Sequence, residues 1–133
     1  MSKYRAYKGI PQKVFNEMRA ITEQYDNWQE ELRDTYGVRP IRLSDKPQGV
    51  SPGSATESTA LRATQLKDWI REIHEAVQRS CPPEHQAHLL YSVTKNRGYT
   101  YMTMRKDWNI SERDFRRYRS AYFRHLAKKR GRI

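Results

Sequence analysis

Apolar residues follow a helical period through the first third of the chain. Between Ile10 and Tyr36 they recur at every third or fourth position, which predicts a seam along one face of a long helix. Pro11 suits the first turn of that helix, and Gly37 suits its end because glycine adopts the left-handed conformation readily. The seam consists of Val14, Met18, Ile21, Tyr25, Trp28, Leu32 and Tyr36. We therefore expect one helix over residues 10–36.

A second one-sided helix is expected after a proline-rich connection. Residues 38–57 hold three prolines and two glycines and show no sustained period, as is typical of a connection. Ser54 or Thr56 suits the cap of the helix that follows. Its apolar stripe consists of Leu61, Leu66, Trp69 or Ile70, Ile73 and Val77. Two such helices favour an antiparallel pair, although a homodimeric bundle would bury the same stripes.

Prolines restart the chain after the second helix. Pro83 suits a first helical position, so we expect a third helix over 83–95, ended by the glycine of "NRGY" at Gly98. Its inward positions are predicted to be Ala87, Leu90, Tyr91 and Val93.

The single cysteine, Cys81, has no partner for a disulfide within the chain. With His85 and His88 it lacks a fourth ligand at any familiar zinc spacing. We predict a small side chain at a helix boundary, with no metal and no cofactor.

Two further helices are predicted in the last third. Thr100 suits the cap of a short helix reaching about Trp108, and Ser111 suits the cap of a longer helix over 112–128. In the linking "WNIS", Asn109 tolerates the left-handed conformation of a tight turn, and Ile110 is placed to fill the gap between the helices. This is the outline of a helix-turn-helix, in which the second helix enters the major groove of DNA.

The last helix divides into an inward and an outward side. Phe115, Tyr118, Tyr122 and Leu126 recur at spacings of three and four residues, which predicts a core-facing stripe, and we expect Trp108 to pack in the core as well. Arginine on the outward side is suited to guanine edges and to phosphates. The residues predicted to contact DNA are Arg105, Lys106, Arg113, Arg116, Arg117, Ser120, Arg124, Lys128, Lys129 and Arg130. Those from Arg124 onward, with Arg132, are expected at backbone phosphates or in a disordered tail. Glu112 or Asp114 is expected to act on the helix dipole rather than on a cytosine.

Charge supports the same segment. The 133 residues carry a net charge of +11, and residues 95–133 account for +10 of it, with thirteen basic and three acidic side chains. A basic helix is often no more than a solvated face. Here the turn, the paired caps and the charge coincide, which favours nucleic acid. No stretch reaches the roughly 18 apolar residues of a membrane span, and "MSKYRAYKGIPQ" lacks the apolar run of a signal peptide. We expect a cytoplasmic protein that does not meet a membrane.

Catalysis has little support in the sequence. Glu30 and Glu31, like Glu72 and Glu75, fall on the polar sides of predicted helices. No nucleophile is spaced from the histidines in a way that suggests catalysis. We expect a protein that is not an enzyme. The expected all-α architecture is a helical hairpin over 1–80, with its connection at 38–57, and a helix-turn-helix domain with a basic tail over 81–133.

The segment "YTYMTMRKDWNISERDFRRYRSAYFRHLAKK" resembles region four of bacterial sigma factors. The wider layout is similar to small phage transcriptional activators of the RinA and ArpU type, and "SPGSATESTALRATQL" looks like their connection into the second helix. The resemblance implies an activator of late phage genes that binds double-stranded DNA and bacterial RNA polymerase in the host cytoplasm. It also implies that Ser111 caps the recognition helix and that Arg113, Arg116 and Arg117 face the DNA.

The chain departs from the family pattern in both motif helices. Thr103, Met104 and Arg105 stand where Glu-Ile-Ala is usual, and Asp114 stands where a threonine is usual. The resemblance therefore supports the fold more firmly than the target sequence. A Q-type antiterminator, a small terminase subunit that forms a homo-oligomeric ring, and a helical interaction module with an incidental basic tail are the alternatives.

Overall fold

A computed structural model of the chain describes residues 9–45, 57–95 and 101–133, and the regular elements in these ranges are helices. The all-α prediction is therefore confirmed. The helices are α1 (Gln12–Glu23), α2 (Tyr25–Tyr36), α3 (Glu57–Ser80), α4 (Pro83–Thr94), α5 (Tyr101–Met104) and α6 (Glu112–Lys129). None of the helices in these ranges combines the length and the apolar character needed to cross a membrane.

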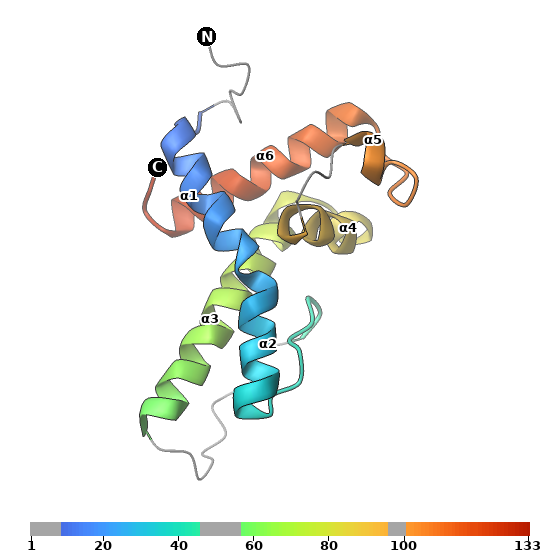
Figure 1. Cartoon of the computed structure of the whole chain (residues 1–133). Coiled ribbons are helices and arrows are strands. Elements are labelled where there is room, and N and C mark those ends of the chain that lie inside the picture. The colour runs from blue at the N-terminus through green and yellow to red at the C-terminus, as the bar shows by residue number, and fades with distance from the viewer. Residues whose placement is uncertain (1–8, 46–56, 96–100) are drawn as a thin grey trace.

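The predicted helix over 10–36 is broken at Gln24. The Gln24 N–H donates to the carbonyl of Ile21 at 3.1 Å, three residues back instead of four. Two residues earlier, the Thr22 hydroxyl donates to the Met18 carbonyl at 2.7 Å, a contact of the kind that bends helices. The break lets α1 pack on α6 while α2 packs on α3 (Figure 1). The expectation of one continuous helix was wrong, although its apolar seam faces the core as predicted.

α2 and α3 lie side by side and run in opposite directions (Figure 1). Gly37 ends α2 in the left-handed conformation with φ 68°, as predicted. Leu32, Leu66 and Ile70 are fully buried between the two helices, and the rings of Trp28 and Trp69 lie 5.3 Å apart. One chain therefore buries both stripes by itself. Leu61 was wrongly expected inside, since 65% of its surface is exposed.

The described part of the connection, residues 38–45, is tied to the α2–α3 pair. The Gln29 amide accepts from the Ile41 N–H at 2.8 Å and donates to the Ile41 carbonyl at 2.7 Å. Gln78 on α3 donates to the Leu43 carbonyl at 2.8 Å. The proposed cap residues Ser54 and Thr56 lie outside the described residues, as do Gly98 and Thr100.

α4 begins at Pro83, as predicted, but the side of the helix that is buried differs from the predicted side. Leu89 and Val93 are fully buried, whereas Ala87 and Tyr91 are exposed. The polar Ser92 is buried as well, and the apolar pattern gave no reason to place it inside. The expectation of Ala87 and Tyr91 as inward positions was wrong.

α6 is central to the core. It contacts α1, α3 and α4 (Figure 1), and Tyr122, Phe123 and Leu126 are fully buried. A single apolar cluster extends from Ile10 to Ala127. The core thus crosses the predicted division between 1–80 and 81–133, so the two segments share one hydrophobic interior.

Candidate nucleic-acid interface

Ser111 caps α6 as predicted. Its backbone is extended, with φ −69° and ψ 153°, and its hydroxyl oxygen accepts from the Asp114 N–H at 3.1 Å. Glu112 and Asp114 lie in the first turn, where carboxylates interact favourably with the helix dipole. They also pair with arginines of the predicted DNA face. Arg116 lies 2.8 Å from Glu112, and Arg117 lies 3.1 Å from Asp114.

Trp108 fixes the segment between α5 and α6 to α4. It is 2% exposed, and its indole N–H donates to His85 Nδ1 at 2.9 Å. Its ring also lies 5.7 Å from that of Phe115. The predicted core roles of Trp108 and Phe115 are confirmed, and the entry to α6 is held by side chains rather than by backbone alone.

The turn itself differs from the prediction. α5 is helical only over Tyr101–Met104, and the chain then turns before reaching Trp108. Asn109 is not left-handed, because no residue other than glycine has positive φ in the described ranges. The Tyr101 hydroxyl donates to the Ile110 carbonyl at 2.8 Å. This hydrogen bond ties the segment before α6 to α5. Ile110 packs on the core as expected.

The inward stripe of α6 is confirmed and is wider than predicted. Phe115, Tyr118, Tyr122 and Leu126 are all buried. The Tyr122 hydroxyl hydrogen-bonds with that of Thr22 on α1 at 2.8 Å, and burial raises the pKa of Tyr122. The prediction missed Phe123, Ala127 and Arg119. The spacing of Phe123, four residues before Ala127 and eight after Phe115, is a helical signal that extends the stripe.

Arg119 is a structural arginine. It is 7% exposed, and its Nη1 donates to the Ser92 carbonyl at 2.7 Å and to the Ser92 hydroxyl at 3.2 Å. Its guanidinium also lies over the rings of Phe115 and Phe123, 5.5 and 5.8 Å from their centroids. One of the thirteen basic residues of the last quarter is therefore part of the core.

Polar and basic side chains line the outward side of α6. We call this set the basic stripe: Arg113, Arg117, Ser120, Arg124 and Lys128. At 100° per residue they fall within about 80° of the helix circumference, and they span roughly 22 Å along its axis. Glu112 and Asp114 fall about 100° to either side of Arg113, so the arc itself holds no carboxylate. Arg113, Arg117 and Lys128 are exposed, whereas Ser120 and Arg124 are half-buried.

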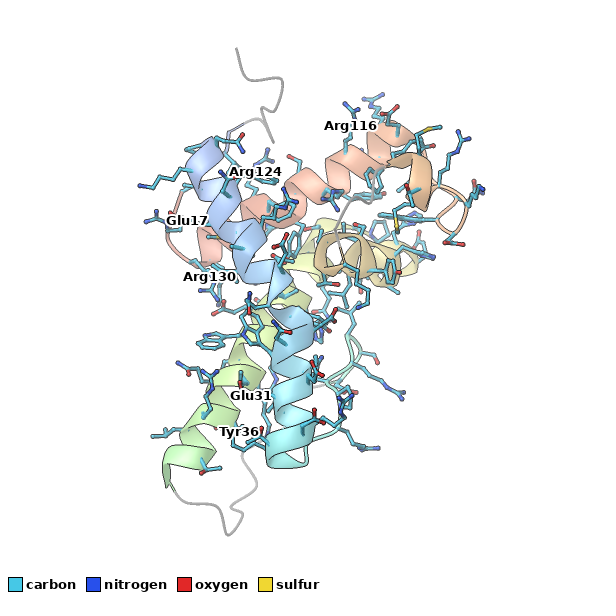
Figure 2. The ribbon with its side chains drawn as sticks, viewed as in Figure 1. Glu17, Glu31, Tyr36, Arg116, Arg124 and Arg130 are labelled. Carbon is cyan, nitrogen blue, oxygen red and sulfur yellow. The ribbon has the colours of Figure 1, made fainter. Side chains whose placement is uncertain are left out.

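Other predicted contacts flank the basic stripe. Arg116 extends into solvent at the N-terminal end of α6, and Arg124 lies nearer α1 (Figure 2). Arg105 and Lys106 are exposed in the turn after α5. In the described parts of the chain, neither forms an ion pair.

The C-terminal residues do not form a disordered tail. Gly131 is left-handed with φ 69°, and the Arg132 N–H donates back to the Ala127 carbonyl at 2.8 Å, which closes the end of α6. Arg132 then forms a bidentate pair with Glu17 of α1 at 2.8 and 2.9 Å. Arg130 Nη2 lies 2.9 Å from Glu72 Oε2 of α3, with both side chains 26% exposed. These partners hold Arg130 and Arg132 against the body of the protein.

Cys81 and Glu31, which were considered for metal and acid–base chemistry, each contact another residue of the fold. Cys81 is buried after α3, and its thiol donates to the Val77 carbonyl at 3.8 Å. Burial raises the pKa of that thiol to about 11. Glu31 pairs with Arg62 at 2.8 Å, and the Arg62 guanidinium lowers the pKa of Glu31.

No family model, curated protein or solved structure matches the chain.

Proposed function

We propose that the protein is a sequence-specific DNA-binding regulator of transcription. In this proposal α4, α5 and α6 form a helix-turn-helix domain like sigma region four, and α6 is its recognition helix. The α2–α3 pair is the N-terminal hairpin that supports it. The basic stripe is the observation that carries the proposal.

The geometry of α6 supports a role in the major groove. That groove is about 12 Å wide and admits one α-helix. α1, α3 and α4 pack on the apolar side of α6, so only its outward side is free to approach DNA. Ser111 at one end and Gly131 at the other hold the helix to a defined length. A rigid helix with one basic side needs little reordering on binding.

Position along the helix suggests two kinds of contact. Arg113 and Arg117 follow the Ser111 cap within the first two turns, the part of a recognition helix that reads base edges. Arg124 and Lys128 lie farther along, where phosphate contacts are expected. Arg105, Lys106 and Arg116 flank this surface, and Ser120 lies within it. Lys129 points toward α3 and is a proposed phosphate contact at the end of the helix. Arg130 is not among the proposed contacts, because Glu72 pairs with it.

The ion pairs of Arg116 and Arg117 do not oppose this role. Both arginine side chains are well exposed, at 74% and 62%, and exposed pairs contribute only about 0–1 kcal/mol. Exchanging a carboxylate for a phosphate or a guanine edge therefore costs little.

The direction of regulation rests on the resemblance to sigma region four. We propose activation of late phage genes, with bacterial RNA polymerase as a second partner in the host cytoplasm.

Selection from a random pool of duplexes tests the proposal. We expect the protein to enrich a common sequence. Arg117→Ala is expected to bind that sequence about 1–3 kcal/mol more weakly and to discriminate less against a scrambled duplex. Arg39→Ala is the matched control, because Arg39 is an exposed arginine outside α6. Absence of an enriched sequence would contradict sequence-specific binding. An equal loss of affinity by Arg117→Ala for the selected and the scrambled duplex would show that Arg117 contacts only the phosphate backbone.

A further inference from the structure

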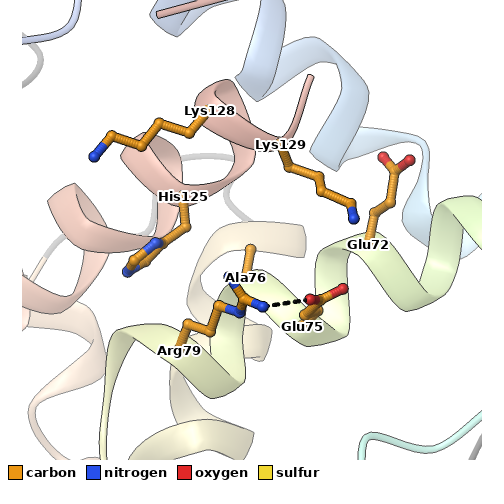
Figure 3. Close-up of a pocket in the computed structure, with 7 residues that line it drawn as sticks. All are labelled: Glu72, Glu75, Ala76, Arg79, His125, Lys128 and Lys129. Carbon is orange, nitrogen blue, oxygen red and sulfur yellow. Dashed lines mark ion pairs between the residues drawn. The ribbon is translucent and has the colours of Figure 1, made fainter. Parts of the chain in front are cut away.

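A pocket of about 250 Å³ lies between α3 and the C-terminal half of α6 (Figure 3). α3 contributes Glu72, Glu75, Ala76 and Arg79, and α6 contributes His125, Lys128 and Lys129. None of the α3 residues was singled out as a DNA contact by sequence pattern. Lys128 belongs both to this pocket and to the basic stripe, so the two surfaces are continuous.

The two carboxylates of the pocket already have cationic partners. Glu75 lies 2.9 Å from Arg79 (Figure 3), and Glu72 lies 2.9 Å from Arg130. Within the described residues, no ion pair joins Lys128 or Lys129 to an acid. Positive charge therefore exceeds negative charge around the pocket. The Arg79–Glu75 pair is weak because the Arg79 side chain is 65% exposed, so Arg79 is free to turn toward an anion.

His125 experiences this excess of positive charge. Burial lowers its pKa, and the nearby cations Arg79, Lys128 and Arg124 lower it further, against a hydrogen bond to the backbone of Arg79. The acids of α3 that line the same pocket are Glu72 and Glu75. An anion in the pocket would reverse the unfavourable effect of the cations and would favour the protonated imidazole.

We infer that this pocket receives a phosphate group of the DNA backbone, held by Arg79, His125 and Lys128. The inference rests on the proposed function. A phosphate is the chemistry that fits, because arginine binds it with a planar pair of N–H groups and lysine binds it as a point charge. DNA is favoured as its source, because Lys128 continues the row of cations that begins at Arg113. The contact would extend the DNA footprint from α6 to the end of α3.

Arg79→Gln tests the contact. Arg71→Gln is the control, since Arg71 is on the same helix but does not line the pocket. Binding to a mixed-sequence duplex is measured across a range of salt concentrations, and the fold of each variant is checked by circular dichroism. We expect Arg79→Gln to reduce the slope of log affinity against log salt by about one, and Arg71→Gln to leave it unchanged.

The pH dependence gives an independent readout. Protonated His125 adds a cation to the phosphate site. Because the pKa of His125 in the free protein lies below its ordinary value of 6.5, DNA affinity is expected to rise as pH falls through and below about 6.5. His125→Gln is expected to reduce this rise. Equal pH profiles for wild type and His125→Gln would overturn the assignment of His125.

The outcomes separate the inference from the proposed function. If Arg79→Gln keeps the wild-type slope while Arg113→Ala/Arg117→Ala loses part of it, the pocket does not bind DNA but the proposed function stands. If the wild type binds no duplex, both fail. Titration with inorganic phosphate, monitored by the NMR signals of the His125 ring, tests whether the pocket binds free phosphate instead of a phosphate of DNA. A response to phosphate together with an unchanged Arg79→Gln slope would overturn the DNA assignment in favour of a free phosphate ligand.

Discussion

At the scale of single residues, buried polar groups connect helices that the apolar pattern treats separately. The Tyr25 hydroxyl lies 2.6 Å from His74 Nε2 and accepts from Gln29 at 3.2 Å. The hydroxyl can accept from Gln29 and also hydrogen-bond with His74 Nε2, which is the acceptor when the neutral ring carries its proton on Nδ1. Burial lowers the pKa of His74 to about 4. The neutral imidazole is thus the form that the fold stabilises.

This arrangement predicts acid sensitivity. The folded pKa of His74 is about 4 and its ordinary value is 6.5, so the unfolded chain binds the extra proton between these values. Stability is full above pH 6.5 and is lost as pH falls toward about pH 4, by about 3 kcal/mol. His74→Gln keeps a polar partner for Tyr25 but cannot titrate. Urea unfolding at several pH values should give a shallower loss for His74→Gln, and identical slopes would contradict the role of His74.

At the scale of elements, the ends of α6 decide how its basic side is presented. The Ser111 cap and the contacts of Trp108 fix where the helix starts. Arg132 against Glu17 fixes its end to α1. A change at either end would act on stability as well as on the direction of the basic stripe.

Ser111→Ala should destabilise the protein by about 1 kcal/mol, because the Asp114 N–H loses its acceptor. Ser111→Asn keeps a side-chain acceptor and should retain most of the stability. Chemical denaturation of the three proteins measures the difference. Equal losses in Ala and Asn would show that the cap hydrogen bond contributes nothing to folding.

Short sequence motifs correctly predicted where several helices begin and end. Most of the wrong predictions concern side chains whose partners are distant in the sequence. Ser111, Pro83 and Gly37 were assigned correctly because capping depends on a few neighbouring residues. The α4 face was misread because Ser92 is buried, where it accepts from Arg119 across 27 positions. The pairing of Arg130 with Glu72 likewise depends on how α3 and α6 pack. A sequence pattern shows which residues are charged but not which charges meet.

At the scale of the whole molecule, less positive charge is available than the count along the chain suggested. Arg119 is inside, and Arg130 and Arg132 pair with α3 and α1. Among the described residues from Arg105 onward, the other basic side chains lie in the turn before α6, beside α3 for Lys129, and on the outward side of α6. The same helix supplies Tyr122, Phe123 and Leu126 to the core. Removing α6 would therefore remove stability and charge together, and surface substitutions are the sharper test.

The central claim is that the basic stripe of α6 binds DNA, and salt dependence tests it most directly. Wild type, Arg113→Ala/Arg117→Ala and Arg39→Ala/Arg42→Ala are titrated with salt on the same mixed-sequence duplex. Both double variants lose two exposed arginines, so their net charges are equal. We predict that the α6 variant lowers the slope of log affinity against log salt by about two and that the control keeps the wild-type slope. Equal slopes for the two variants would contradict the claim, because charge alone, and not its place on α6, would then account for binding.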